Sequence, residues 1–329
     1  MNPSYLALAF MLVLVVPVGW AYSNRDFGFS IDPPQGWNLT ESPYVVALFM
    51  DQSSTGFAPR LSIDVLDRVR TDIEEVISQL EATYRSMFTN LSILERLETT
   101  LGGLEVRILV CTWVQGIHDV KMKEVVIRNG NRYYDLAYIA TRGDYDKHLA
   151  AFEESVGSIS FTDSIYENPD LGLDLVYPSG WALDEGSIPG AAIFYGPEEA
   201  GFLTNVVLLN EPWSGDLEGY VEDQKSKMAE TMTELEMVEE GNVTIGDFVG
   251  SMLVYTYQMP GPLDLKSRMD TLVKGGRALN LVYTSRADRY WDYLPCMESM
   301  MKSLEIDQGP ILPVAAMGFA LSLFVVREF

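Results

Sequence analysis

Apolar residues recur along the chain with the two spacings that distinguish strands from helices. Leu61, Ile63 and Val65 alternate with polar residues, which predicts a half-buried strand. A helix is predicted next, because apolar residues then recur at intervals of three and four, namely at Ile73, Val76, Ile77, Leu80, Tyr84 and Phe88. The segment Thr71-Asp72-Ile73-Glu74 has the pattern of a capping box and marks the start of this helix.

Further strands and a second helix are predicted downstream. We expect strands near 104–114, over 122–128 and over 132–140. Asn129-Gly130 lies between the last two and is a strong signal for a two-residue hairpin turn. The closing helix carries apolar residues at Tyr145, Leu149, Phe152 and Val156. A short strand over 27–31 opens the series and meets a Pro-x-Gly-Trp turn that starts a second strand. The predicted order is β-β-β-α-β-β-β-β-α.

The second half of the chain repeats this pattern. Residues 27–37 match 171–181 at an offset of 144, and both segments contain Pro-x-Gly-Trp. After one extra residue the offset is 145, and it aligns Gly130, Arg132, Leu136, Tyr138, Tyr145 and Leu149 with Gly275, Arg277, Leu281, Tyr283, Tyr290 and Leu294. A period of this length indicates two whole domains rather than a solenoid. We place the first repeat at 22–163 and the second at 170–307, with a polar linker over 162–170.

Each repeat is predicted to be an α+β domain, an antiparallel sheet flanked by helices. Trp37 and Trp181 occupy the same position in the two copies, directly after the Pro-x-Gly turn. Each copy needs a large apolar side chain where its first strands turn, so we interpret both tryptophans as structural anchors of the core. Trp213 and Trp291 have no tryptophan partner in the first repeat and would mark a binding face if exposed.

The opening strand Gly28-Phe29-Ser30-Ile31, followed by Pro-x-Gly-Trp, a helix, a long antiparallel meander and a closing helix, resembles the PsbP/Mog1-type domain. The resemblance covers both repeats. It implies two tandem α-β-α sandwich domains that serve binding or assembly at membranes without catalysis. The histidines through which photosystem members are thought to engage metals have no match here, so the resemblance carries over no metal site and no cofactor.

Both ends of the chain are apolar and predict an exported, membrane-bound protein. The run from Leu6 to Val18, followed by Gly19-Trp20-Ala21, has the pattern of a signal peptide over 1–21. At the other end 310–327 is predicted to be a transmembrane anchor, in which the apolar stretch from Ile311 to Val326 would span about 24 Å as a helix. A buried terminal strand or helix is the alternative. The tail is also similar to the apolar part of archaeal sorting signals, without their Pro-Glu-Phe or Pro-Gly-Phe motif.

Three acceptor sequons agree with an extracytoplasmic address at the cell surface. Asn38, Asn90 and Asn242 are the glycosylation candidates. Cys111 and Cys296 are the only two cysteines and lie at non-equivalent positions, so the sequence contains no repeated disulfide framework. Each is expected to be a small buried apolar residue, with a bridge between the repeats as the alternative.

The net charge of −24 argues against nucleic acid as a partner, because a phosphate-binding surface needs clustered lysine and arginine. The second repeat carries most of this charge, since 166–307 holds 25 acidic and 9 basic residues (−16) and 22–165 holds 21 and 13 (−8). Glu234, Glu236, Glu239 and Glu240 form the densest acidic run. Its spacing is not that of a calcium loop, so we interpret it as a solvated face, with a weak cation site as the alternative.

The sequence offers little for catalysis. It contains two histidines, His118 and His148, and no nucleophile elbow, zinc-binding helix motif, Cys-x-x-Cys or phosphate loop. We therefore expect no catalytic residues and a non-catalytic binding or assembly module of the envelope. Its partners would be the membrane, through the C-terminal helix, and an envelope protein, glycan or lipid. The alternatives are a hydrolase with a dispersed site near one histidine, and a cation-responsive envelope protein.

Overall fold

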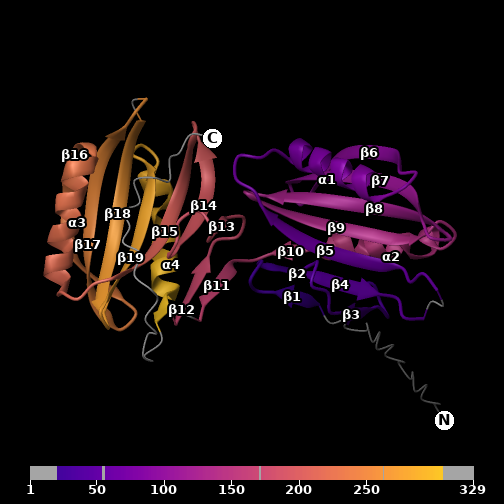
Figure 1. Cartoon of the computed structure of the whole chain (residues 1–329), viewed down its shortest axis with the longest axis horizontal. Coiled ribbons are helices and arrows are strands. Elements are labelled where there is room, and N and C mark those ends of the chain that lie inside the picture. Colours follow the sequence, from indigo (N-terminus) through magenta and orange to yellow (C-terminus); the bar gives the residue numbers. More distant parts are fainter. Residues whose placement is uncertain (1–20, 54–55, 170–171, 262, 307–329) are drawn as a thin grey trace, which may run out of the picture.

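The computed structural model describes residues 21–53, 56–169, 172–261 and 263–306. It contains two units side by side, each built around a seven-stranded antiparallel sheet (Figure 1). The strand orders are β3-β4-β5-β9-β8-β7-β6 and β13-β14-β15-β19-β18-β17-β16, so the two sheets have the same topology. Together with the four helices of the described residues, they agree with the expected two tandem sheet-plus-helix domains.

The first repeat has ten strands and two helices within the described residues. They are β1 (Tyr22–Asn24), β2 (Phe29–Ile31), β3 (Asn38–Thr40), β4 (Ala47–Met50), β5 (Arg60–Asp67), α1 (Ile73–Met87), β6 (Ser92–Leu101), β7 (Leu104–Gln115), β8 (His118–Asn129), β9 (Arg132–Thr141), α2 (Tyr145–Ser158) and β10 (Ser160–Phe161).

The second repeat has the same order of elements. They are β11 (Ser164–Asn168), β12 (Leu173–Tyr177), β13 (Ala182–Asp184), β14 (Ala191–Glu199), β15 (Phe202–Pro212), α3 (Leu217–Thr231), β16 (Thr233–Ile245), β17 (Phe248–Met259), β18 (Leu263–Lys274), β19 (Arg277–Arg286), α4 (Tyr290–Ser303) and β20 (Glu305–Ile306).

Equivalent elements keep the offsets seen in the sequence. Helices α1 and α3 begin 144 residues apart, as do β7 and β17, whereas β8 and β18, β9 and β19, and α2 and α4 begin 145 residues apart. The extra residue lies in a turn, because two residues separate β7 from β8 and three separate β17 from β18. An insertion in a turn leaves the register of both neighbouring strands intact, which a one-residue slip within a strand would not.

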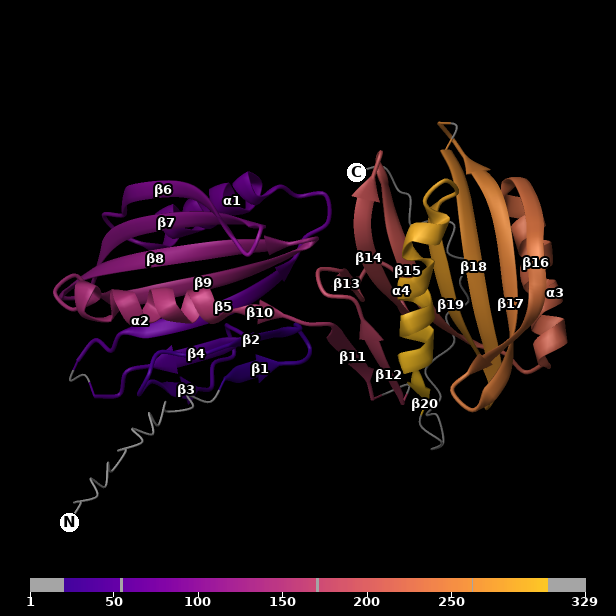
Figure 2. The same cartoon turned by 180° about the vertical axis from the view of Figure 1, so that it is seen from behind.

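One helix packs on each face of each large sheet (Figure 2). Alternate side chains of β9 point to opposite faces. Tyr134 and Tyr138 join the cluster of Phe152 on α2, whereas Tyr133 packs with Ile77 of α1. The second repeat divides in the same way, with α4 on one face and α3 on the other. Because alternate residues of each strand are buried on opposite faces of the sheet, the spacing of apolar residues in the sequence was sufficient to predict these strands.

A small three-stranded sheet completes each repeat on the α2 or α4 side. It consists of β1, β2 and β10 in the first repeat and of β11, β12 and β20 in the second. Strand β11 lies inside the expected polar linker, because Ser164 to Asn168 pair with β12. We therefore count β11 with the second repeat. The expected order also lacked β1, β10 and β20, since strands of two or three residues contain too few alternating positions to be recognised.

The first helix begins one residue later than its capping-box pattern suggested. Its N-cap is Asp72, whose Oδ1 accepts a hydrogen bond from the backbone N–H of Glu75 at 2.8 Å. The hydroxyl of Thr71 instead donates to the carbonyl of Val69 at 3.3 Å. Asp216 caps α3 in the equivalent way. The aspartate is therefore the capping residue in both repeats.

Replacing Asp72 with alanine is expected to destabilise the protein by about 1 kcal/mol, because one of the first N–H groups of α1 loses its acceptor. Urea denaturation followed by circular dichroism measures the change. Thr71→Ala is the matched control and should change the free energy of unfolding by less than about 0.5 kcal/mol. If Thr71→Ala were the more damaging of the two, the assignment of the cap would be wrong.

Candidate functional site

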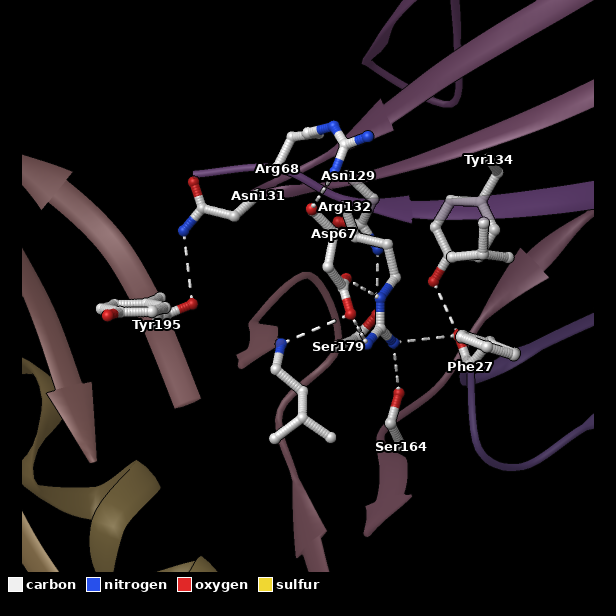
Figure 3. Close-up of polar contacts among 12 residues, drawn as sticks. Phe27, Asp67, Arg68, Asn129, Asn131, Arg132, Tyr134, Ser164, Ser179 and Tyr195 are labelled. Carbon is white, nitrogen blue, oxygen red and sulfur yellow. Dashed lines mark hydrogen bonds and ion pairs between the residues drawn. The ribbon is translucent and has the colours of Figure 1, made fainter. Parts of the chain in front are cut away.

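The most developed polar arrangement in the described chain lies where the two repeats meet, and it is centred on Arg132 (Figure 3). Arg132 is the first residue of β9 and is only 1% exposed. The β8–β9 hairpin turn packs against the Pro-Ser-Gly-Trp turn of 178–181, and Arg132 follows it directly and reaches Ser164 and Tyr177 of the second repeat. A buried guanidinium requires acceptors on all sides, since an unpaired buried charge is strongly unfavourable.

Both repeats supply the acceptors of Arg132. Asp67 at the end of β5 accepts hydrogen bonds from Nε and Nη2 at 2.7 and 3.1 Å, a side-on bidentate pair. Nη1 donates to the carbonyl of Phe27 at 3.2 Å and to Ser164 Oγ at 2.7 Å. Nη2 also donates to the hydroxyl of Tyr177 at 2.9 Å. Burial alone lowers the pKa of Arg132, but the hydrogen bonds and charge of Asp67 outweigh it and raise that pKa above its ordinary value.

The two turns at this junction approach each other through glycines. Gly130 and Gly180 both have positive φ, +62° and +78°. A Cβ atom on Gly130 would lie 2.4 Å from the carbonyl oxygen of Gly180, closer than real Cβ atoms come. The close approach lets the N–H of Asn131 donate to that same carbonyl at 2.9 Å. Glycine is therefore required in both turns for conformation, and at Gly130 for space as well.

Asparagine side chains extend the contact on either side of Gly130. Asn131 Nδ2 donates to the carbonyls of Tyr195 and Gly196 on β14, at 3.3 and 2.6 Å (Figure 3). Asn129 Nδ2 donates to Ser179 Oγ at 2.9 Å. The hairpin turn of the first repeat is thus a docking surface for a folded protein domain, and the domain it holds is the second repeat.

The internal repeat aligned Arg132 with Arg277, but the sequence alone suggested no role for either arginine. The available signal was an arginine retained in both copies directly after a hairpin turn, at the start of an otherwise apolar strand. Its partners could not be found in that way, because Asp67, Ser164 and Tyr177 come from three separate segments.

A pair of carboxyl groups is buried under α1 in the first repeat. Glu124 on β8 lies beside Asp135 on β9, and Tyr84 of α1 donates its hydroxyl to Glu124 Oε1. Burial raises the pKa of Glu124 to about 7, against the lowering effect of its polar contacts with Tyr84 and Asp135. Burial and the charge of Glu124 also raise the pKa of Asp135 well above its ordinary value. Met269 and Asn280 occupy the equivalent positions, so the second repeat lacks this pair.

The two histidines lie apart from this pair. His148 Nε2 is 3.8 Å from Asp51 Oδ2, and its ring contacts Trp37. Ser53 Oγ donates to Asp51 Oδ1 at 2.6 Å, so this serine is bonded to the carboxylate and not to the imidazole, which is not the order of a catalytic triad. The ring of His118 packs 5.6 Å from that of Phe57.

The acidic run of the second repeat lies on the edge strand β16. Glu234, Glu236, Glu239 and Glu240 are all exposed, and Glu240 pairs with Lys225 of α3 at 2.6 Å. Among the described ranges, no group of three or more histidine, cysteine, aspartate or glutamate side chains is arranged to hold a metal ion.

The remaining sequence candidates lie as follows. Trp181 is buried, and its indole packs so tightly on Gly196 that a Cβ there would lie 2.7 Å from the ring. Trp37 is half-buried against Tyr138. Trp213 donates its indole N–H to the carbonyl of Asp216, and Trp291 is 69% exposed. The three sequon asparagines, Asn38, Asn90 and Asn242, are exposed.

The two cysteines are free, with Cys111 buried and Cys296 half-buried, so the alternative of a bridge between the repeats is wrong. The predicted signal peptide and C-terminal anchor fall on 1–20 and 307–329, outside the described residues. Within the ranges that the structure describes, no helix has both the length and the apolar character needed to span a bilayer.

Comparisons with known proteins assign no family. No family model matches the sequence, and no curated protein matches it. Solved structures that match include PsbP of Synechocystis sp. PCC 6803, at 14% identity and a TM-score of 0.34 over 44% of this chain and 93% of that one. LpqN of Mycobacterium tuberculosis, involved in cell envelope biogenesis, matches at 16% identity and a TM-score of 0.36, over 44% and 90%. The immunity protein TplEi of Pseudomonas aeruginosa matches at 13% identity and a TM-score of 0.26, over 85% and 95%.

The buried carboxyl pair predicts that the protein is more stable in weak acid than in weak base. The pKa of Glu124 is about 7 in the folded protein and ordinarily 4.5, so the folded state binds the extra proton between these values. Its contribution to stability is complete below pH 4.5 and is lost as the pH rises through about 7. Glu124→Gln keeps the shape and the hydrogen bond from Tyr84 without a charge to bury.

We therefore expect Glu124→Gln to flatten the dependence of stability on pH and to stabilise the protein at pH 8 by on the order of 2 kcal/mol. Urea denaturation at pH 5 and pH 8 measures the effect. The exposed Glu154→Gln serves as control and should follow the wild type at both values. A Glu124→Gln profile parallel to that of the wild type would contradict the raised pKa.

Proposed function

We propose that the protein is a membrane-anchored, extracytoplasmic binding and assembly module of the cell envelope, without catalytic activity. In this proposal the signal peptide (1–21) exports the chain, the tail (310–327) holds it in the membrane, and two tandem α-β-α sandwich domains of PsbP type form the exterior part. The observation that carries the proposal is the junction itself. The hairpin end of this fold receives a folded protein domain through a buried arginine and a backbone contact between two turns.

Other features support the same interpretation. The exposed positions of Asn38, Asn90 and Asn242 suit glycan attachment outside the cell. Each exposed end of the pair of domains could present a surface to an envelope partner, and a short tail would hold that surface near the membrane. The strongly acidic second repeat favours protein partners over nucleic acid or an anionic lipid surface.

Cell fractionation and cross-linking test this proposal in the producing cells. The full chain should remain with membranes after alkaline washing and be cleaved by protease added to intact cells. A chain ending before Pro310 should instead be released into the medium. Cross-linking on intact cells should join the full chain to at least one envelope protein. A chain that stays in the cytosol, or one that resists external protease, would contradict the proposal.

A further inference from the structure

The hairpin end of the second repeat, equivalent to the end that docks onto Tyr177 and Gly180 in the first, contains a pocket. Four aliphatic side chains form its walls, namely Leu173, Leu272, Leu279 and Ile306. Three polar side chains complete the lining, namely Asn210, Lys274 and Arg277. We call this the distal pocket.

The distal pocket exists because the second repeat has smaller side chains at equivalent positions. In the first repeat this space is filled by three aromatic rings, Phe29, Tyr134 and Phe161, with ring centres 5.7 and 4.5 Å apart along the series. At the offsets of 144 and 145 their counterparts are Leu173, Leu279 and Ile306. Replacing aromatic rings by aliphatic side chains leaves apolar space that a partner side chain can enter.

The arginine of the distal pocket lacks the counter-charge that its equivalent has. Arg132 is bound by the carboxylate of Asp67, whereas Arg277 donates only Nε, to Asn210 Oδ1 at 2.6 Å. The residue equivalent to Asp67 is Glu211, and its Oε2 accepts the hydroxyl of Tyr220 instead. Within the described residues Arg277 forms no ion pair, and neither of its terminal nitrogens donates a hydrogen bond.

A second cation lies beside it. Lys274 Nζ is buried and has no hydrogen-bond partner among the described residues; it lies 4.0 Å from the centre of the Phe248 ring. Burying an ammonium group without a hydrogen-bond acceptor is energetically unfavourable, because the group loses its hydration. A cation–π contact replaces only part of that lost interaction energy. Its equivalent, Asn129, donates to Ser179 of the docked domain. Lys274 therefore occupies the position from which this fold contacts its docked partner.

We propose that the distal pocket is the docking site for a partner protein that inserts a glutamate side chain carried on a turn. This inference rests on the proposed function and specifies its partner. The aliphatic walls accommodate the methylene groups of the glutamate, and Lys274 and Arg277 bind its carboxylate. In the first repeat Asp67 supplies the negative charge that binds Arg132. In the second repeat the partner must supply the negative charge that binds Arg277. In a chain of net charge −24, two adjacent unpaired cations attract an acidic partner locally.

A peptide with the sequence pattern of the docked turn tests this proposal. Residues 177–181, Tyr-Pro-Ser-Gly-Trp, meet the hairpin end of the first repeat, so the probe is acetyl-Glu-Pro-Ser-Gly-Trp-amide. Calorimetric titration of the full chain should show binding about tenfold tighter than that of the matching glutamine peptide, because charge-assisted hydrogen bonds are the stronger ones. Arg277→Gln and Lys274→Met should each weaken binding of the glutamate peptide by about tenfold and leave binding of the glutamine peptide unchanged.

Arg286→Gln is the matched control, since Arg286 lies at the opposite end of β19 in an exposed pair with Asp288. It should bind both peptides as the wild type does. Equal binding of the two peptides, or unchanged binding by Arg277→Gln and Lys274→Met, would overturn the proposal. Acetate that binds as tightly as the glutamate peptide would show a site for free organic anions instead. Self-association of the wild type that Lys274→Met abolishes would assign the pocket to a second copy of the chain.

Failure here is distinguishable from failure of the proposed function. If cross-linking on intact cells recovers the same envelope partner with Lys274→Met as with the wild type, the module binds through another surface and only the distal pocket is wrong. If the peptide binds as expected while the full chain is cytosolic, the proposal for the distal pocket is supported and the proposed cellular location is wrong.

Discussion

The guanidinium of Arg132 is the interaction on which the arrangement of the two repeats depends. It is almost completely buried, and it is satisfied only when acceptors from both repeats surround it. Asp67 provides the compensating charge from the same repeat, and Ser164 and Tyr177 provide hydroxyl groups from the other. Separating the repeats would leave this network open to water at one side and would also break the backbone contact between Gly180 and Asn131.

The two repeats share one fold but differ in the side chains that fill it. Strand order, helix positions and the residue offsets are shared, so the fold tolerates the exchange of whole groups of side chains. Under its first helix the first repeat has the buried Glu124 and the half-buried Asp135, where the second has Met269 and Asn280. At the hairpin end the first repeat is packed with aromatic rings and covered by a domain, whereas the second has a pocket with two cations. The second repeat has therefore kept the geometry of the docking end and changed its chemistry.

The sequence was informative where one physical rule acts along consecutive residues. Alternation in β9 and helical spacing in α1 identified those elements to within a residue or two, and the shift of offset predicted an insertion that the structure places in a turn. The short strands were missed because their pairing depends on distant segments, as the pairing of β10 with β2 shows. The junction was missed for the same reason. Alternation tells on which face of a sheet Glu124 lies, but not that Tyr84 and Asp135 will be its neighbours.

A double-mutant cycle between Arg132 and Tyr177 measures most directly whether the hairpin end of the first repeat is a docking site for the second. Arg132→Met and Tyr177→Phe each remove one partner of the hydrogen bond that crosses the junction, and the double variant removes both. We expect a coupling energy of about 1.5–3 kcal/mol in the free energy of unfolding, the range for a buried hydrogen bond to a charged group. A coupling energy indistinguishable from zero would mean that the two repeats are not held together through this arginine.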